Sequence, residues 1–195
     1  MTSSNKASIV ILISGRGSNM KSIVEAIKTG SLNVNVAAVI SNRPDAGGIE
    51  YAQQENIPTA VIDHKQFETR ELFDQAMAKE IDNYSPNLVV LAGFMRILTT
   101  EFVEHFAGKL VNIHPALLPK FKGLNTHQRA IDAGEKEHGA SVHIVTAELD
   151  DGPVVLQAKV PVLPNDTADL LAARVLEQEH SLYPKAIAQL ITELQ

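Results

Sequence analysis

The stretch IVILISGRGSN, residues 9–19, decides the fold class. Its first five residues are all aliphatic, which is typical of a strand buried on both faces of a parallel sheet. A glycine-rich turn at residues 14–18 ends this run. The apolar residues that follow recur at helical spacing, namely Met20, Ile23, Val24 and Ile27. The stretch therefore predicts a buried strand, a tight turn and a helix, which is the repeating unit of α/β proteins.

Strands and helices alternate along the rest of the chain. We expect strands at residues 34–40, 59–62, 88–92 and 110–114, and helices at residues 48–55 and 67–83. The segments 141–146 and 154–162 flank a turn and predict an antiparallel pair. Residues 166–194 indicate a closing helical segment, which we expect to be interrupted at Tyr183-Pro184. We therefore predict an α/β fold: a doubly wound, mostly parallel, Rossmann-like sheet with helices on both faces and antiparallel strands near the C-terminal part.

The composition limits the possible classes of protein. With 195 residues, the chain is long enough for one full core, so we expect one domain over residues 1–195. The net charge of -6 and the lack of basic runs disfavour a nucleic-acid partner. The apolar run at residues 9–13 is too short for a signal peptide or a membrane span, so we expect a cytoplasmic protein without a membrane partner. A homodimer is compatible with the sequence, although no pattern locates its interface.

The turn after the first strand is a candidate phosphate site. Free N–H groups and the positive dipole at the start of a helix bind anions. The turn is similar to a dinucleotide fingerprint, but Met20 stands where the third glycine would fall, and Ser41-Asn42-Arg43 replaces the ribose-binding acid. We therefore disfavour an NAD site. The alternative is a structural turn in which Ser18 or Asn19 caps the helix.

Asn112 and His114 are the strongest candidates for chemistry. Because they are two residues apart on an expected strand, their side chains point to the same side of the sheet. Pro115 then directs the chain out of the sheet, which places both residues at the carboxyl edge, where open α/β sheets bind ligands. There, an amide and an imidazole can stabilise an oxyanion and move a proton. The alternative is a structural histidine.

Four other polar residues allow both a functional and a structural interpretation. Asp150 and Asp151 either supply a carboxylate to the site or only form the turn before a Gly-Pro pair. Ser141 and His143 share one strand face, which either looks into the same cleft or is satisfied within the sheet.

Two classes of catalytic centre are disfavoured. The chain has no cysteine and no HExxH motif, so we predict no metal site. It also lacks the Gly-x-Ser-x-Gly motif of serine hydrolases. An acyl-transfer site without its own nucleophile fits an acceptor that supplies one.

Several motifs in order along the chain resemble those of the phosphoribosylglycinamide formyltransferases of purine biosynthesis. The similar stretches are residues 12–19, 40–42, 91–98, 112–115, 117–119, 139–143, 149–153 and 177–180. This resemblance implies transfer of a formyl group from 10-formyltetrahydrofolate to the amino group of glycinamide ribonucleotide. Two positions depart from some relatives: Asp151 replaces a glycine, and Asn125 replaces a histidine.

The resemblance also implies roles for individual residues. The catalytic set falls on Asn112, His114 and Asp150. The ribonucleotide-binding residues fall on Gly17, Ser18 and Asn19 for the phosphate and on Glu179 for the ribose. The folate-binding residues fall on Arg70, Met95, Arg96, Ile97, Leu98, Asn112, Thr146, Ala147, Glu148, Leu149 and Asp150. No metal is implied.

Three other functions remain as alternatives. A formyltetrahydrofolate hydrolase would use the same three catalytic residues, but that class usually carries an additional N-terminal domain. A methionyl-tRNA formyltransferase needs a basic C-terminal domain, which a chain ending at Gln195 does not provide. A non-catalytic nucleotide-binding or folate-binding module would keep the fold alone.

Overall fold

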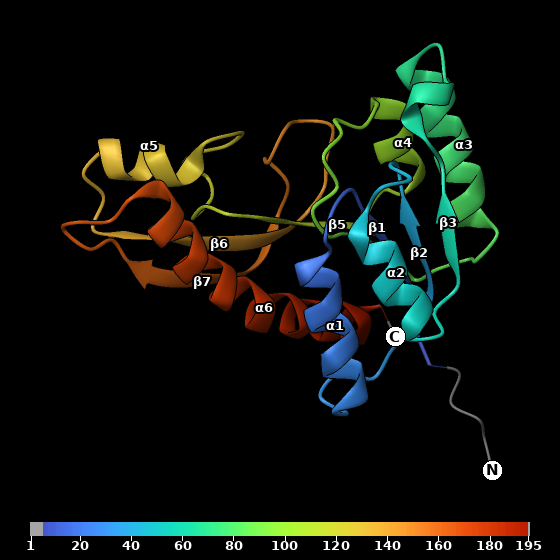
Figure 1. Ribbon diagram of the computed structural model, residues 1–195, viewed down its shortest axis with the longest axis horizontal. Helices are drawn as coiled ribbons and strands as arrows, with labels where there is room; N and C mark the ends of the chain where they lie inside the picture. The colour runs from blue at the N-terminus through green and yellow to red at the C-terminus, as the bar shows by residue number, and fades with distance from the viewer. Residues whose placement is uncertain (1–5, 195) are drawn as a thin grey trace.

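A seven-stranded sheet forms the centre of the molecule in the computed structural model, which describes residues 6–194 (Figure 1). The strands are β1 (Ser8–Ile13), β2 (Asn35–Ser41), β3 (Thr59–Val61), β4 (Leu88–Leu91), β5 (Leu110–His114), β6 (Glu137–Ile144) and β7 (Val154–Pro161). Their order in the sheet is β3-β2-β1-β4-β5-β6-β7. The first five strands are parallel, whereas β6 and β7 run antiparallel to their neighbours. The predicted fold class is therefore confirmed.

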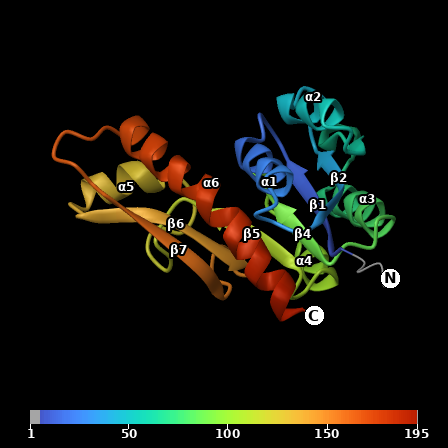
Figure 2. The same ribbon diagram turned by 90° about the horizontal axis from the view of Figure 1, so that it is seen from below.

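Helices cover both faces of this sheet. They are α1 (Ser18–Lys28), α2 (Gly47–Gln54), α3 (Arg70–Asp82), α4 (Thr100–His105), α5 (Thr126–Asp132) and α6 (Ala168–Glu193), together with the short 3₁₀ helix η1 (His64–Gln66). One buried cluster joins the sheet to α1, α2 and α6, and a second joins it to α3 and α4. Figure 2 shows α6 crossing beneath the sheet, with α5, β6 and β7 extending away from the parallel strands.

Strand β1 shows why a continuous aliphatic run becomes a central strand. Side chains alternate between the two faces of a strand. Ile9, Ile11 and Ile13 accordingly enter the cluster with α1 and α6, whereas Val10 and Leu12 enter the cluster with α3. All five are fully buried. Both faces of the sheet at β1 are covered by helices and require apolar residues. The sequence of β1 therefore shows no alternation of apolar and polar residues.

The strand order reverses between β1 and β4. From β1 the chain proceeds outward to β3 and then returns to the other side of β1. Such a switch point leaves a crevice at the carboxyl ends of the two strands, where open α/β sheets bind ligands. The backbone N–H of Ser14, after β1, donates to the carbonyl of Gly93, after β4, at 3.2 Å. The two loops at the switch point are thus joined.

The closing helix differs from the prediction, because α6 continues through Pro184. Proline removes one helical hydrogen bond and costs about 3 kcal/mol inside a helix. Buried apolar residues lie on both sides of it, including Leu182, Tyr183, Ala186 and Ile187. Their packing against the sheet outweighs this cost. Helices α4 and α5 were not predicted. Within residues 6–194, no helix is sufficiently long and apolar to cross a bilayer.

Candidate active site

Asn112 and His114 lie side by side at the carboxyl end of β5, as their spacing predicts. The antiparallel pairing with β6 places His143 opposite Asn112 and Ser141 opposite His114. The amide nitrogen of Asn112 lies 3.4 Å from Nε2 of His143. Ser141 is occupied within the fold, because its hydroxyl donates to the carbonyl of Ala116 at 2.7 Å. Thus His143 joins the cluster, whereas Ser141 supports the backbone beside it.

Asp150 completes this cluster from the loop between β6 and β7. Its carboxylate lies 3.4 Å from Nδ1 of His114 and 3.6 Å from Nε2 of His143. The backbone N–H of Gly123 also donates to it, at 2.9 Å. Asp150 adopts a left-handed conformation with φ of 50°, which aspartate tolerates better than most residues. The turn therefore aims this one carboxylate inward.

Asp151 points elsewhere. Its side chain is 52% exposed and forms an ion pair with Lys122, whereas the Asp150 side chain is 8% exposed. The following position, 152, accepts only glycine, because a Cβ atom there would lie 1.7 Å from the carbonyl oxygen of Ile144. The geometry thus separates two neighbouring acids, of which the family resemblance had implied Asp150.

Both ring nitrogens of His114 face hydrogen-bond acceptors. Nε2 lies 2.8 Å from the carbonyl oxygen of Phe121, so it must carry a proton and donate. Nδ1 faces the carboxylate of Asp150. The carboxylate of Asp150 therefore lies where it can orient the imidazole ring at the end of β5.

His143 is held in the neutral form. Burial lowers the pKa of its imidazole, and the nearby carboxylate of Asp150 only partly offsets this effect. A neutral ring with its proton on Nδ1 can donate to the carbonyl of Ile144, 3.2 Å away. Nε2 is then free to accept from the amide of Asn112. This contact orients the Asn112 amide. The sequence contained one indication that His143 belongs to the site, namely that residues 141 and 143 share one face of their strand.

The predicted phosphate site lies at the N-terminus of α1. Gly17 caps this helix in the left-handed conformation, and no side chain within residues 6–194 caps it. The alternative interpretation, a cap by Ser18 or Asn19, is therefore wrong. The uncapped N–H groups of the first turn remain available to an anion.

Asn19 and Glu179 meet behind this turn. The amide of Asn19 donates to the carboxyl of Glu179 at 2.8 Å, which joins α1 to α6. Burial raises the pKa of the Glu179 carboxyl, although the hydrogen bond from Asn19 opposes the shift. The predicted phosphate-binding and ribose-binding residues are therefore neighbours in the fold.

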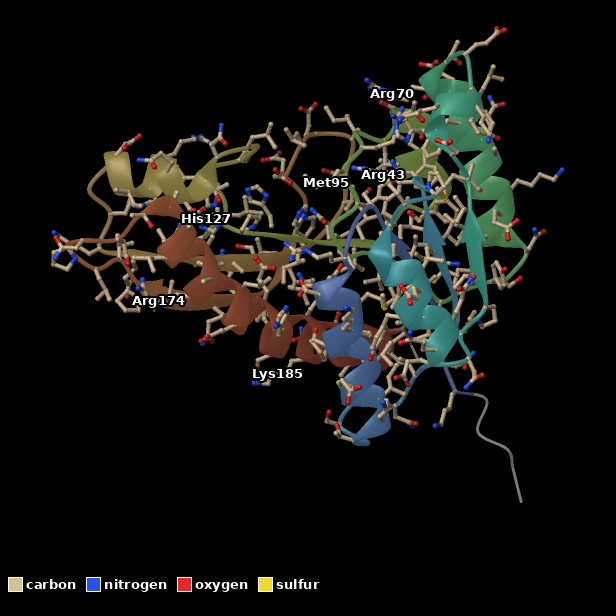
Figure 3. All side chains as sticks on the ribbon, in the orientation of Figure 1. Arg43, Arg70, Met95, His127, Arg174 and Lys185 are labelled. Carbon is tan, nitrogen blue, oxygen red and sulfur yellow. The ribbon has the colours of Figure 1, made fainter. Side chains whose placement is uncertain are left out.

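The predicted folate residues come from three separate segments. Met95 and Ile97 project outward, 73% and 64% exposed, whereas the guanidinium of Arg96 lies over the Phe73 ring at 4.9 Å. Leu98 and Val145, which precedes the loop at residues 146–150, pack against the same buried cluster. Arg70 lies at the start of α3 and projects above Met95 in Figure 3. Within residues 6–194, no hydrogen bond or ion pair links Arg70 to the other predicted residues.

Two contacts to the cluster of Asn112, His114 and Asp150 could not be found from residue types. Phe121 contributes its carbonyl oxygen and Gly123 its N–H. Both are backbone groups, so the sequence carries no signal for them. Lys122 lies between them and pairs with Asp151. Within residues 6–194, no group of three or more His, Cys, Asp or Glu side chains is arranged so that it could hold a metal ion.

The fold and the site together define a class: an α/β enzyme with an amide, an imidazole and a carboxylate at the carboxyl edge of its sheet. Residues 7–187 match the model of the family described as formyl transferase, so the chain belongs to the formyl transferase family. It is a formyltransferase enzyme.

Individual relatives agree with this assignment. The chain is 54% identical over 180 residues to the phosphoribosylglycinamide formyltransferase of Escherichia coli, a match that covers 92% of this chain and 85% of that relative. It is 42% identical to the trifunctional purine biosynthetic protein adenosine-3 of Drosophila melanogaster, where the match covers 98% of this chain and 14% of the other. A solved structure of the Coxiella burnetii phosphoribosylglycinamide formyltransferase superposes with a TM-score of 0.90 at 51% identity, and the match covers 94% of this chain and 86% of that one.

Proposed function

We propose that this enzyme transfers the formyl group of 10-formyltetrahydrofolate to the amino group of glycinamide ribonucleotide, a step of purine biosynthesis. One observation carries the proposal. Asn112, His114 and Asp150 lie together at the carboxyl edge of the sheet, where the uncapped N-terminus of α1 follows β1 and the exposed apolar segment of residues 95–98 follows β4. The names of the relatives support the same substrate and pathway.

Each end of the site suits one substrate. The ribonucleotide phosphate is placed at the N-terminus of α1, with the ribose at Glu179. The flat pterin ring is placed against residues 95–98 and the loop at residues 146–150, where Met95, Ile97 and Leu149 offer exposed apolar surface. The amine of the ribonucleotide then meets the formyl carbon beside His114.

The reaction proceeds without a covalent enzyme intermediate, because the amine is itself a nucleophile. Its lone pair forms a bond to the formyl carbon, and the carbonyl electrons move to oxygen. Asn112 and the His114 imidazolium stabilise this oxyanion. The oxyanion then collapses, the bond to N10 of the folate breaks, and the proton of the former amine reaches N10. Asp150 orients the His114 ring and assists this proton transfer.

His114 must exchange a partner before it can serve the oxyanion. Its Nε2–H is held by the carbonyl of Phe121, a residue with a φ of 55°. A left-handed conformation is costly for a bulky residue. We expect the developing oxyanion, a stronger acceptor, to replace this carbonyl.

A formyltetrahydrofolate hydrolase is the competing function, with water in place of the amine. The deciding experiment follows tetrahydrofolate release from 10-formyltetrahydrofolate with and without glycinamide ribonucleotide. Release that depends on the ribonucleotide supports the transferase. Release without it supports the hydrolase, and no release under either condition supports a binding module. We also propose that residues 1–195 act as one cytoplasmic domain, either as a monomer or as a homodimer.

A further inference from the structure

The segment of residues 95–98 has a defined shape without regular secondary structure. Met95 and Ile97 face outward, whereas Phe94, Arg96 and Leu98 face the protein. Extended segments show this alternation. Residues 95–98 lie outside the sheet, so no strand pairing holds their backbone. Other groups must therefore fix it.

Ser14 holds the beginning of the segment. Its buried hydroxyl accepts a hydrogen bond from the backbone N–H of Met95, at 2.8 Å. The same hydroxyl donates to the side-chain oxygen of Asn42, which fixes the direction of its proton. Ser14 thereby links the ends of β1 and β2 to the start of the segment.

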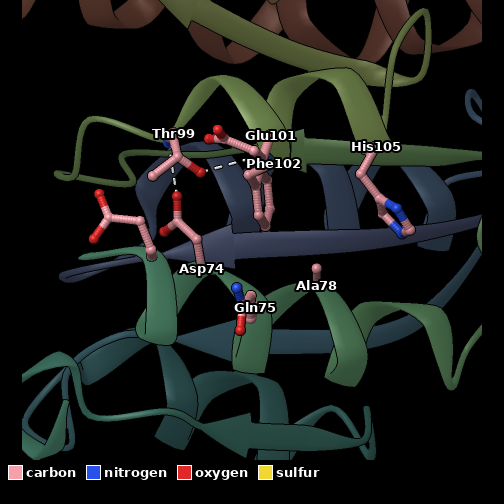
Figure 4. A pocket seen from close by; sticks show the side chains of 8 residues that line it. Asp74, Gln75, Ala78, Thr99, Glu101, Phe102 and His105 are labelled. Atoms are coloured by element: carbon pink, nitrogen blue, oxygen red, sulfur yellow. Dashed lines mark hydrogen bonds between the residues drawn. The ribbon is translucent and has the colours of Figure 1, made fainter. Parts of the chain in front are cut away.

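Asp74 holds the other end. Its carboxylate accepts from the backbone N–H of Thr99 at 2.7 Å, and the side chain of Thr99 caps α4 in turn (Figure 4). Asp74 is only 3% exposed and lies in the wall of a cavity of about 350 Å³ between α3 and α4. Its neighbour Phe73 supports the guanidinium of Arg96. One turn of α3 therefore fixes both the middle and the end of the segment.

The second oxygen of Asp74 has no hydrogen-bond partner within residues 6–194. Burial of a carboxylate with an unmatched oxygen is costly, and a neutral residue would avoid that cost. A hydrogen bond to a charged acceptor is stronger than one to a neutral acceptor. We infer that Asp74 suits this position because its charged oxygen binds the backbone N–H of Thr99 strongly.

We propose that Ser14 and Asp74 are positioning residues that preorganise residues 95–98 for the folate and so set folate affinity. This inference rests on the proposed function, which places the pterin against the segment. Neither residue contacts the reacting atoms. A segment fixed before binding loses less conformational entropy when the ligand arrives.

The test measures tetrahydrofolate binding by calorimetry in variants of the full chain. Asp74→Ala and Ser14→Ala should each raise the Kd about tenfold, the cost of a lost hydrogen bond. Ser14→Thr retains the acceptor hydroxyl and should rescue most of the affinity, whereas Asp74→Asn retains only a weaker, neutral acceptor oxygen and should rescue part of it. Glu71→Gln alters the same cavity without touching the segment, and it should leave the Kd unchanged.

Two further measurements separate positioning from a general structural role. The KM for glycinamide ribonucleotide and the kcat should stay near wild type while the KM for the folate rises. The double variant Ser14→Ala/Asp74→Ala should lose less affinity than the product of the single effects, because both act through one segment. Folded alanine variants with an unchanged Kd, or with equal rises in both KM values, would overturn the inference. A wild-type enzyme that binds tetrahydrofolate but does not formylate the ribonucleotide would contradict the proposed function alone.

Discussion

The parallel strands and the antiparallel strands of the one sheet differ in what they bury. Strand β1, at the centre of the parallel part (β1 to β4), buries five aliphatic side chains. Strand β6, in the antiparallel part (β5 to β7), buries His138, Ser141 and His143. The parallel part therefore buries apolar side chains that stabilise the fold, and the antiparallel part also buries polar and titratable ones. Substitutions in the two parts should consequently affect different measurements.

Strand β6 can bury polar side chains because neighbouring groups form hydrogen bonds with them. The hydroxyl of Ser141 accepts from the N–H of Leu118 and from the amide of Gln157, while it donates to the carbonyl of Ala116. Buried polar groups without such partners destabilise a fold. The antiparallel part thus needs the loop after β5 as a hydrogen-bonding layer, which the parallel part does not.

The largest effect is expected at Asp150. Asp150→Asn removes the charge that faces His114, and kcat should fall on the order of 10³-fold, as for loss of acid–base catalysis. Asp151→Asn, the matched control, alters an exposed ion pair and should change kcat by about twofold or less. Steady-state kinetics with both substrates measures the difference. Equal losses in the two variants would refute the assignment of Asp150.

The parallel part should respond in stability instead of turnover. Ile11 is fully buried in the centre of β1. Ile11→Ala should lower the free energy of unfolding by about 2–5 kcal/mol, because it removes apolar contacts and leaves a cavity. Urea unfolding measures this loss. At a temperature where the variant is folded, kcat should stay close to wild type. A large fall in kcat would contradict the conclusion that substitutions in the parallel part affect stability and not turnover.

The antiparallel part should also be the more sensitive to acid. Burial, with a contribution from His127, lowers the pKa of His138 from 6.5 to about 4. As pH falls below 6.5, the unfolded chain binds this proton first, so stability is lost between pH 6.5 and about 4. Urea unfolding across this range should show a smaller loss for His138→Gln than for wild type. Identical pH dependences would exclude His138 as the cause.

Glu179, which joins α1 to α6, should show the opposite dependence. Burial raises the pKa of its carboxyl above 4.5, so the unfolded chain loses this proton first as pH rises, and stability falls. Glu179→Gln should reduce that fall. It should also raise the KM for the ribonucleotide about tenfold, through loss of a charged acceptor. Glu177→Gln, on the exposed side of α6, is the control and should change neither.

The sequence predicted the parallel part better than the rest. A run such as residues 9–13 has few alternatives to a buried strand, and the predicted strands lie within a few residues of those in the structure. Helices α4 and α5 have only six and seven residues, too few for a helical period to stand out. The interruption at Pro184 was wrong because tertiary packing outweighed a local rule.

The site could be predicted from spacing only where its side chains follow the two-residue repeat of a β-strand. The spacing of Asn112 and His114 fixes their shared side, and the pairing with His143 follows from the register. The family resemblance implied Asp150, whereas residue type alone does not separate Asp150 from Asp151; the structure separates them because Asp150 adopts a φ of 50°. Ser14 and Asp74 hold backbone N–H groups, so nothing in their own sequence context indicates this role.

Tyr183 has a consequence for the choice of substrate. Its hydroxyl lies 2.7 Å from the carbonyl oxygen of Leu91 and 3.1 Å from that of Val111, the residue directly before Asn112. Glu179 lies one turn earlier on the same helix, about 6 Å along its axis. If Glu179 binds the ribose, as we propose, helix α6 sets the distance between the ribose site and β5. Since this distance is fixed by helix geometry, an acceptor whose amine stands one carbon farther from its ribose would not align with the formyl carbon.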